Sequence, residues 1–168
     1  TTRHAMEIRH ENLLPIQDVL ATRSMGFVVS ALSDAQPLED VIDTDESMSS
    51  SRILLIAEGI LHGLQALHKQ RKRLVHGSLS PQSVLIDEFD HVQLSYPGFT
   101  QGDGCLDPFS EVPGPYAFMA PEVALGEEMT RRADIFSFGC ILWLMVTGEA
   151  PVMGSALKSV YTHAFGQH

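Results

Sequence analysis

The sequence predicts an α+β fold in which short strands are followed by a mainly helical part. One observation is a set of short runs with the composition and length of strands. A second is a long stretch with apolar residues at helical spacing, and a third is an apolar run of helix length near the end of the chain. The predicted strands are residues 13–21, 25–32, 83–87 and 91–95, and the two long predicted helices cover 52–70 and 135–146.

The first fifty residues predict a helix end, two strands and an acidic connection. Residues 1–10 suit the end of a helix, and the strands at 13–21 and 25–32 flank a short turn at 22–24. The stretch from Ser33 to Ser51 is acidic and rich in serine, with a short helix expected at 37–43. We therefore expect an N-terminal strand pair followed by a polar connection.

The helix expected at 52–70 has a clear amphipathic pattern. Its apolar stripe, widened by two further side chains, consists of Ile53, Ile56, Ala57, Ile60, Leu61, Leu64 and Leu67. Gly59 and Gly63 each cost about 1 kcal/mol in a helix interior relative to alanine. Two such residues in one helix indicate that a neighbouring element packs closely against it.

The second half of the chain predicts a hairpin, a long loop and a buried helix. Residues 88–90 connect the strands at 83–87 and 91–95, and residues 98–115 have the Gly, Pro and Asp content of a loop. A short helix is expected around 121–125, with a stop at Gly126. We expect Asp134 to cap the N-terminus of the last helix, which Gly148 and Pro151 end.

The last helix contains the longest apolar run of the chain, at 135–146. This run is shorter than the ~20 residues that a membrane span requires. A helix that is hydrophobic on all sides, at this length, belongs in the centre of a core. We therefore expect no transmembrane segment and a soluble domain.

Composition narrows the possible partners. The net charge of −10 disfavours binding to a phosphate backbone, so no nucleic-acid partner is expected. The eight His residues show no metal-binding spacing, so no metal site is expected. Neither Cys105 nor Cys140 belongs to a CxxC pattern, and Cys140 is expected to be buried. Together with the absence of a visible signal peptide, these features favour an intracellular, cytoplasmic location.

Five stretches occur in the order known from one large family. They are IRHENLL at 8–14, HGSLSPQS at 76–83, YPG at 96–98, APE at 120–122 and DIFSFGCILW at 134–143. The second, third and fourth resemble the kinase signatures H-R-D-L-x-x-x-N, D-F-G and A-P-E. In this combination the chain resembles the protein kinase fold, with a mainly helical large lobe and the last strands of the small lobe.

The resemblance implies a division of the chain and a partial domain. Residues 1–32 match a remnant of the small lobe, a helix end and two strands. Residues 33–168 match the large lobe, truncated after its central helix. The rest of the small lobe and the terminal helices are expected elsewhere in the parent chain.

The resemblance also shows which chemistry is replaced. Ser78 stands where the family has its catalytic Asp, and a hydroxyl near its normal pKa cannot accept a proton at neutral pH as a carboxylate does. Ser83 stands at the position of the metal-binding Asn, and Tyr96 at that of the metal-binding Asp of D-F-G. A neutral phenol is a poor ligand for Mg²⁺, which prefers carboxylate oxygens.

Other motif positions divide into replaced residues and retained ones. Gly77 replaces an Arg that meets an activation-loop phosphate, Ser80 replaces a Lys, and Pro97 replaces the Phe of D-F-G. The retained structural positions are His76, Leu79, Pro81, Glu122 and Asp134. Of these, Asp134 is implied to hydrogen-bond the catalytic-loop backbone. Leu85, Ile141 and Met145 match the floor under the adenine ring, although ordinary core packing is the more common role for such residues.

These replacements predict a catalytically degenerate kinase-like domain, a pseudokinase that is not an enzyme and needs no cofactor. Its expected role is that of a scaffold or protein-interaction module with a protein partner. One alternative is a structural subunit embedded in a larger multi-protein assembly. Another is an atypical enzyme that binds ATP and Mg²⁺, in which Asp103, Asp107 and Glu111 supply metal ligands.

Overall fold

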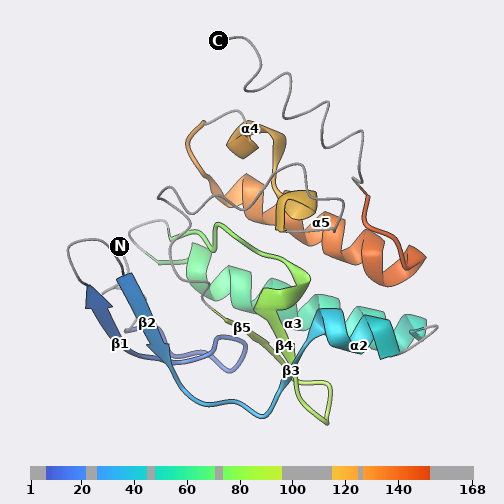
Figure 1. The fold of residues 1–168 in the computed structure, drawn as a ribbon, viewed down its shortest axis with the longest axis horizontal. Coiled ribbons are helices and arrows are strands. Elements are labelled where there is room, and N and C mark those ends of the chain that lie inside the picture. The colour runs from blue at the N-terminus through green and yellow to red at the C-terminus, as the bar shows by residue number, and fades with distance from the viewer. Residues whose placement is uncertain are drawn as a thin grey trace.

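The fold combines small antiparallel sheets with two long helices (Figure 1). The structure is a computed structural model and describes residues 7–21, 26–44, 48–70, 74–95, 115–124 and 127–151. Within these ranges one sheet has the order β1-β2 and the other the order β3-β4-β5. The arrangement confirms the predicted α+β class.

The first sheet is the strand pair predicted near the N-terminus. β1 (Ile16–Ala21) pairs antiparallel with β2 (Gly26–Ser30), and Val19 lies opposite Val28. The predicted turn at 22–24 lies outside the described residues.

The prediction of a helix end at residues 1–10 is wrong for residues 7–10, which are not helical. The backbone N–H of Leu13 instead donates to the carbonyl oxygen of His10 at 3.1 Å, which closes a turn. The side chain of Asn12 donates from Nδ2 to the carbonyl oxygen of Val92 at 2.9 Å. This long-range bond attaches the segment to a strand of the second sheet, so its hydrogen bonds are made there instead of within a helix.

The second sheet contains the two strands predicted at 83–87 and 91–95 and one strand that the sequence did not predict. β4 (Val84–Ile86) and β5 (Val92–Leu94) form the expected hairpin. β3 (Gln36–Pro37) pairs antiparallel with β4 and has only two residues, too few for a recognisable pattern. The helix α2 (Leu38–Thr44) follows β3 directly and matches the short helix expected at 37–43.

The amphipathic helix α3 (Ser50–His68) begins two residues before its predicted start. The hydroxyl of Ser49 accepts a hydrogen bond from the backbone N–H of Arg52, so Ser49 is the N-cap. The predicted stripe is buried apart from Leu61, which is 40% exposed. Leu61 therefore does not widen the buried stripe as expected.

The last long helix, α5 (Arg131–Thr147), differs from the prediction in two respects. Its N-cap is Thr130, whose hydroxyl accepts from the N–H of Arg132, and Asp134 lies within the first turn. The helix is also not buried on all sides in the described structure. Ile135, Phe136, Trp143 and Val146 are exposed, and Trp143 retains 54% of its surface. The C-terminal end is as predicted, with Gly148 left-handed at φ 76°.

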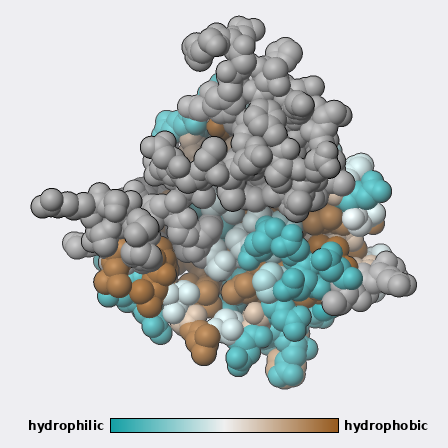
Figure 2. Space-filling model, in the orientation of Figure 1, coloured by the Kyte–Doolittle hydropathy of each residue, from teal (hydrophilic) through white to brown (hydrophobic). Residues whose placement is uncertain are grey.

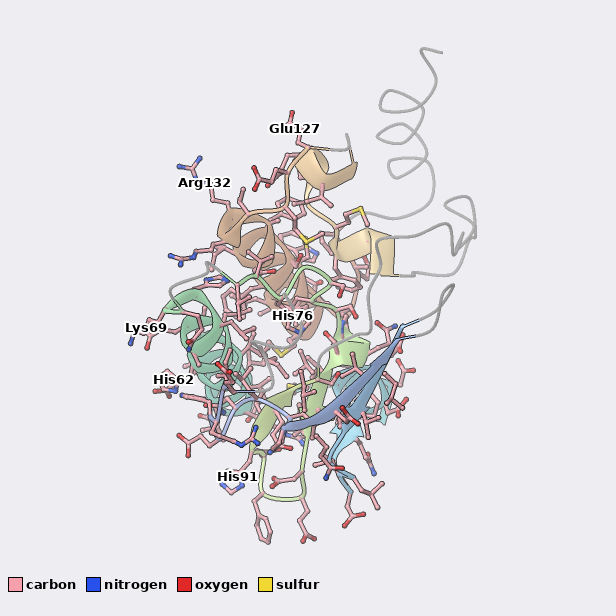
Figure 3. The ribbon with its side chains drawn as sticks, turned by 90° about the vertical axis from the view of Figure 1, so that its left-hand side faces the viewer. His62, Lys69, His76, His91, Glu127 and Arg132 are labelled. Atoms are coloured by element: carbon pink, nitrogen blue, oxygen red, sulfur yellow. The ribbon has the colours of Figure 1, made fainter. Side chains whose placement is uncertain are left out.

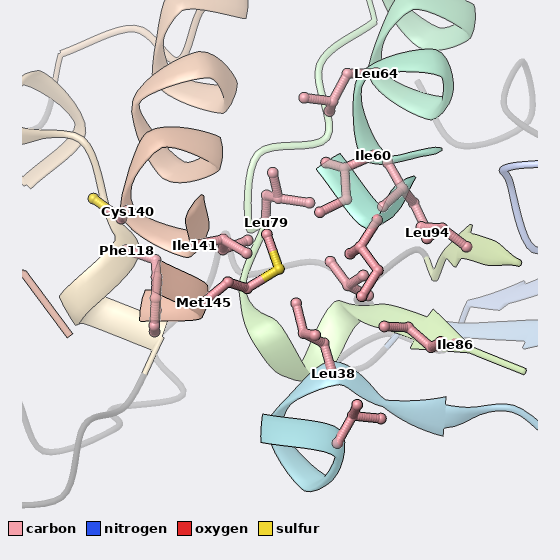
Figure 4. Packing of buried hydrophobic residues seen from close by; sticks show 14 of the residues in the cluster. Leu38, Ile60, Leu64, Leu79, Ile86, Leu94, Phe118, Cys140, Ile141 and Met145 are labelled. Atoms are coloured by element: carbon pink, nitrogen blue, oxygen red, sulfur yellow. The ribbon is translucent and has the colours of Figure 1, made fainter. Parts of the chain in front are cut away.

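The core lies where α3, α5, the segment 74–83 and the second sheet meet (Figure 4). Leu79 lies in the close-up between Ile60 of α3 and Ile141 of α5. Cys140 is buried as predicted, and burial raises the pKa of its thiol. In the described ranges no helix is both long enough and apolar enough to cross a membrane.

Gly59 and Gly63 mark the close approach between α3 and the sheet that the sequence indicated. A Cβ added at Gly59 would lie 2.7 Å from Cβ of Val92. A Cβ added at Gly63 would lie 2.7 Å from the carbonyl oxygen of Asn12 and 2.8 Å from Cδ1 of Leu94. Glycine is required at both positions because a side chain would push the helix off the sheet.

We expect Gly63→Ala to lower the free energy of unfolding by about 1–3 kcal/mol, because the added methyl group overpacks the contact with a backbone carbonyl. Gly139→Ala on α5 is the matched control, since its Cβ would meet no atom within 4 Å. That change should raise the free energy of unfolding by up to about 1 kcal/mol through helix propensity alone. Urea denaturation measures both, and equal effects would contradict the close-packing explanation.

Candidate functional site

The candidate site is the segment 74–83 together with Asp134 of α5, which holds the segment in place. The Asp134 side chain is 1% exposed. Its Oδ2 accepts a hydrogen bond from the backbone N–H of His76 at 2.9 Å, and its Oδ1 accepts one from the N–H of Gly77 at 2.8 Å. A buried carboxylate is stable only with such donors, so the contact requires Asp134 and the loop backbone to stay together.

His68 is a third donor to the same carboxylate. Its Nε2 lies 2.7 Å from Oδ2 of Asp134, and because the carboxylate accepts, His68 donates. His68 is the last residue of α3, whereas Asp134 is in the first turn of α5. The carboxylate of Asp134 thus joins two helices and the loop between them.

His76 is 5% exposed, and Figure 3 labels it near the middle of the view. Its Nε2 is 3.0 Å from the carbonyl oxygen of Ser95 and donates to it. Burial lowers the pKa of His76, and the nearby Asp134 only partly opposes that effect. His76 is therefore a buried link between the loop and Ser95, the residue that follows β5.

Because burial lowers the pKa of His76, the unfolded chain binds the additional proton before the folded chain does as the pH falls. The contribution of His76 to stability is complete above the unfolded pKa of about 6.5 and is lost below it, by at most about 1.4 kcal/mol per pH unit. We expect His76→Gln to reduce the slope of the free energy of unfolding against pH. Urea midpoints across the range below about pH 6.5 test it, and identical slopes for both proteins would contradict it.

Gly77 has a backbone and a neighbour that exclude a side chain. Its φ is +83°, a conformation that glycine adopts readily and other residues rarely do. A Cβ added at Gly77 would overlap Sδ of Met129. Met129 thus occupies the space into which a larger residue at position 77 would extend, so Gly77 is matched to its surroundings.

Ser83 uses its hydroxyl within the loop. In the short turn η1 (Pro81–Ser83), Oγ of Ser83 donates to the carbonyl oxygen of Ser80 at 2.9 Å and accepts from the N–H of Ser80 at 3.0 Å. The carbonyl oxygen of Ser83 accepts from the N–H of Ser95 at 2.8 Å. Ser83 therefore stabilises the loop backbone. Ser78, at the other motif position in the loop, is half-buried.

The other residues that the motifs selected lie in different surroundings. Leu79 and Pro81 are buried in the loop, and Ile141 and Met145 are part of the core. Leu85 is half-buried in β4, and Glu122 is half-buried in α4 (Pro121–Ala124). Tyr96, Pro97, Cys105 and the acidic residues Asp103, Asp107 and Glu111 lie outside the described residues.

A small cavity of about 190 Å³ adjoins the loop at Pro81. Glu39, Asp43 and Glu149 are among its lining residues, which makes its surroundings acidic. On the surface next to it, Gln82 donates from Nε2 to Oε1 of Glu39 at 2.8 Å. Acidic groups therefore lie beside the exposed Gln82, in a lining that also contains the apolar side chains of Phe118 and Leu144.

Within the described residues, the site lacks the groups that phosphate-bound Mg²⁺ requires. Residues 74–83 include no Asp or Glu, and the hydroxyl of Ser83 is committed to the backbone. No group of three or more His, Cys, Asp or Glu side chains in the described part of the chain could hold a metal ion. Residues 74–83 therefore offer no carboxylate to a metal ion.

Sequence reasoning missed His68 and Met129. Neither belongs to a motif, and each is separated from its partner in the chain by many residues. No local pattern marks such contacts, because they arise only when α3, α5 and the loop come together.

Comparison with known proteins identifies the family. The family described as "Protein kinase domain" matches residues 3–168. A leucine-rich repeat receptor-like serine/threonine/tyrosine-protein kinase, SOBIR1 of Arabidopsis thaliana, is 31% identical over 86% of this chain. The serine/threonine-protein kinase-transforming protein mos of Myeloproliferative sarcoma virus is 30% identical over 88%. Mitogen-activated protein kinase kinase kinase 13 of Homo sapiens is 26% identical over 89%. The chain spans 24%, 48% and 15% of the lengths of these relatives, respectively.

These comparisons correct the expectation that the domain is not an enzyme. The matching family is that of protein kinase domains, and the similar proteins are named serine/threonine kinases. The expectation rested on replaced side chains in a few motif positions. The likeness over nearly the whole chain points to an enzyme family instead.

Proposed function

This chain belongs to the protein kinase domain family, and on that premise we propose that the face around residues 74–83 binds another protein. The observation that carries the proposal is the hydrogen bonding of Asp134 to His76 and Gly77. This contact holds the loop in one conformation. A preformed surface binds with less loss of conformational entropy than a flexible one.

Within this proposal, residues 1–32 form the remnant of a small lobe and residues 33–168 form the large lobe. The packing residues of the loop, Leu79 and Pro81, are buried and provide rigidity from below. Gln82 and the acidic groups near it provide polar groups at the surface. The loop thus combines a fixed backbone with one exposed hydrogen-bonding side chain, that of Gln82.

Phosphoryl transfer is the second candidate function, and the names of the relatives favour it. A protein kinase must also bind a protein substrate, so the two candidates share one binding face. They differ in what Ser78 contributes, since a serine at that position gives no general-base assistance. Transfer by this chain would depend on positioning and electrostatics alone.

Site-specific photo-crosslinking tests the binding function. A photoreactive amino acid replaces Gln82 in the full chain, and the same group replaces the exposed Glu58 on α3 as a control. We expect one protein to be crosslinked reproducibly from position 82 in cells that produce this chain and not from position 58. No adduct from position 82, or the same adducts from both positions, would contradict the proposal.

A further inference from the structure

A second and larger cavity lies away from the catalytic loop, beside the β4–β5 hairpin. It measures about 940 Å³, and we call it the hairpin groove. Its walls come from the N-terminal turn, the connection between β2 and β3, and the hairpin. The lining residues that matter for the argument are Glu11, Leu32, Asp34, Ile86, Glu88 and Phe89.

The groove exposes two large apolar side chains. Leu32 is 96% exposed and Phe89 is 71% exposed, whereas Ile86 and Val92 of the same lining are buried. The lower face in Figure 2, where this hairpin lies in Figure 1, shows separate brown hydrophobic atoms among teal hydrophilic ones. These two side chains offer separate apolar contact points along one cavity.

The rim of the groove is acidic. Glu11, Asp34 and Glu88 are exposed, and the lining contains no Lys or Arg among the described residues. Nδ1 of the lining residue His91 lies 3.0 Å from Oδ2 of Asp87, so its polar atom is engaged within the hairpin. An acidic rim attracts a positively charged ligand and repels a phosphate backbone.

Hydrogen bonds hold the walls of the groove. Oδ1 of Asp87 accepts from the backbone N–H groups of Phe89 and His91, each at 2.9 Å. The guanidinium of Arg52 on α3 lies 2.8 Å from Oδ1 of Asp90 in the same turn. These contacts hold the backbone of the hairpin turn that carries Phe89.

We propose that the hairpin groove docks an extended peptide segment of another protein that carries Lys or Arg beside large apolar side chains. The apolar side chains contact Leu32 and Phe89, and the cations lie against Glu11, Asp34 and Glu88. The inference rests on the proposed protein-binding function and gives it a second surface with a defined partner chemistry.

Fluorescence anisotropy with the full chain tests the groove directly. The probe is the labelled peptide GLSFGRKG, and the comparison peptides are GLSFGEEG, with reversed charge, and GSSSGRKG, without apolar side chains. We expect the first peptide to bind at least about tenfold more tightly than either other one. Its affinity should fall as ionic strength rises, because salt screens exposed charges. Equal binding of all three peptides would overturn the proposal.

Matched variants locate the binding site. Leu32→Ser combined with Phe89→Ser should weaken binding of GLSFGRKG about tenfold. Asp34→Lys combined with Glu88→Lys should reverse the preference toward GLSFGEEG. The controls are Leu61→Ser and the charge-matched pair Glu58→Lys with Glu127→Lys, all exposed and outside the groove lining. All substituted residues are at the surface, and thermal melting verifies that each variant is folded. Equal loss of binding in the groove variants and the controls would contradict the proposal.

The groove and the catalytic-loop face can fail separately. If the peptide does not bind but a protein is still crosslinked from position 82, only the proposal for the groove is overturned. Groove-dependent peptide binding without any Gln82 adduct would support the groove and contradict the proposed loop surface.

Discussion

Asp134→Ala is expected to lower the free energy of unfolding by about 3–5 kcal/mol. The substitution removes the acceptor for the backbone N–H groups of His76 and Gly77 and for Nε2 of His68. The N–H of His76 is buried, so water cannot replace the lost acceptor at no cost. The effect is large because one carboxylate joins α3, α5 and the loop.

Urea denaturation of the full chain measures this effect. Asp134→Asn should cost less than the alanine variant, since the amide retains one acceptor oxygen. The control is Glu128→Ala, an exposed acidic residue whose removal should change the stability by no more than about 0.5 kcal/mol. An alanine variant at position 134 that is as stable as this control would contradict the anchoring role.

The second large effect concerns phosphoryl transfer. We expect the triple variant Ser78→Asp, Ser83→Asn and Tyr96→Asp to transfer phosphate about 10²–10⁴-fold faster than the double variant without Ser78→Asp. The double variant supplies the proposed metal-binding groups, and the added Asp supplies a base. The comparison of the two therefore isolates the contribution of the residue at position 78.

Transfer of labelled phosphate from ATP to a generic protein substrate, with Mg²⁺ present, measures both rates. A variant that adds Ser51→Asp, at an exposed position of α3, to the double variant controls for the additional negative charge. If the triple and double variants react at the same rate, position 78 is not where the base acts. If the Ser51 control matches the triple variant, charge alone explains the gain.

The sequence predicted the elements whose patterns are local. The stripe of Ile53, Ile60 and Leu64 has helical spacing, so α3 was evident. Two short strand-like runs on either side of the connection at 88–90 predicted the hairpin of β4 and β5. The capping residue of α5 was not predictable in this way. Thr130 and Asp134 are both suitable N-cap types, and only the contact of Asp134 with the distant loop decides between them.

The faces of α5 were not predictable for a related reason. Its apolar residues occupy nearly every position, so no periodicity shows which side meets the core. The structure buries Ile141 and Met145 and exposes Ile135 and Trp143. Full burial of the helix was therefore an overstatement drawn from composition.

The candidate site was partly predictable. The order of the motifs located the loop at 76–83 and selected Asp134, because these residues are close to their motif neighbours in the chain. His68 and Met129 complete the site only through tertiary contacts. The expectation of a non-enzyme failed because it weighed a few replaced side chains above the likeness of the whole chain to protein kinases.

The binding constant for the protein crosslinked at Gln82 tests the central claim most directly. Titration calorimetry compares the full wild-type chain with Asp134→Asn and with the control Glu128→Gln, at a temperature where all three are folded. A loop preformed by Asp134 predicts binding about tenfold weaker for Asp134→Asn and unchanged for Glu128→Gln. Equal affinity of Asp134→Asn and wild type would contradict the claim that the anchored loop is the binding surface.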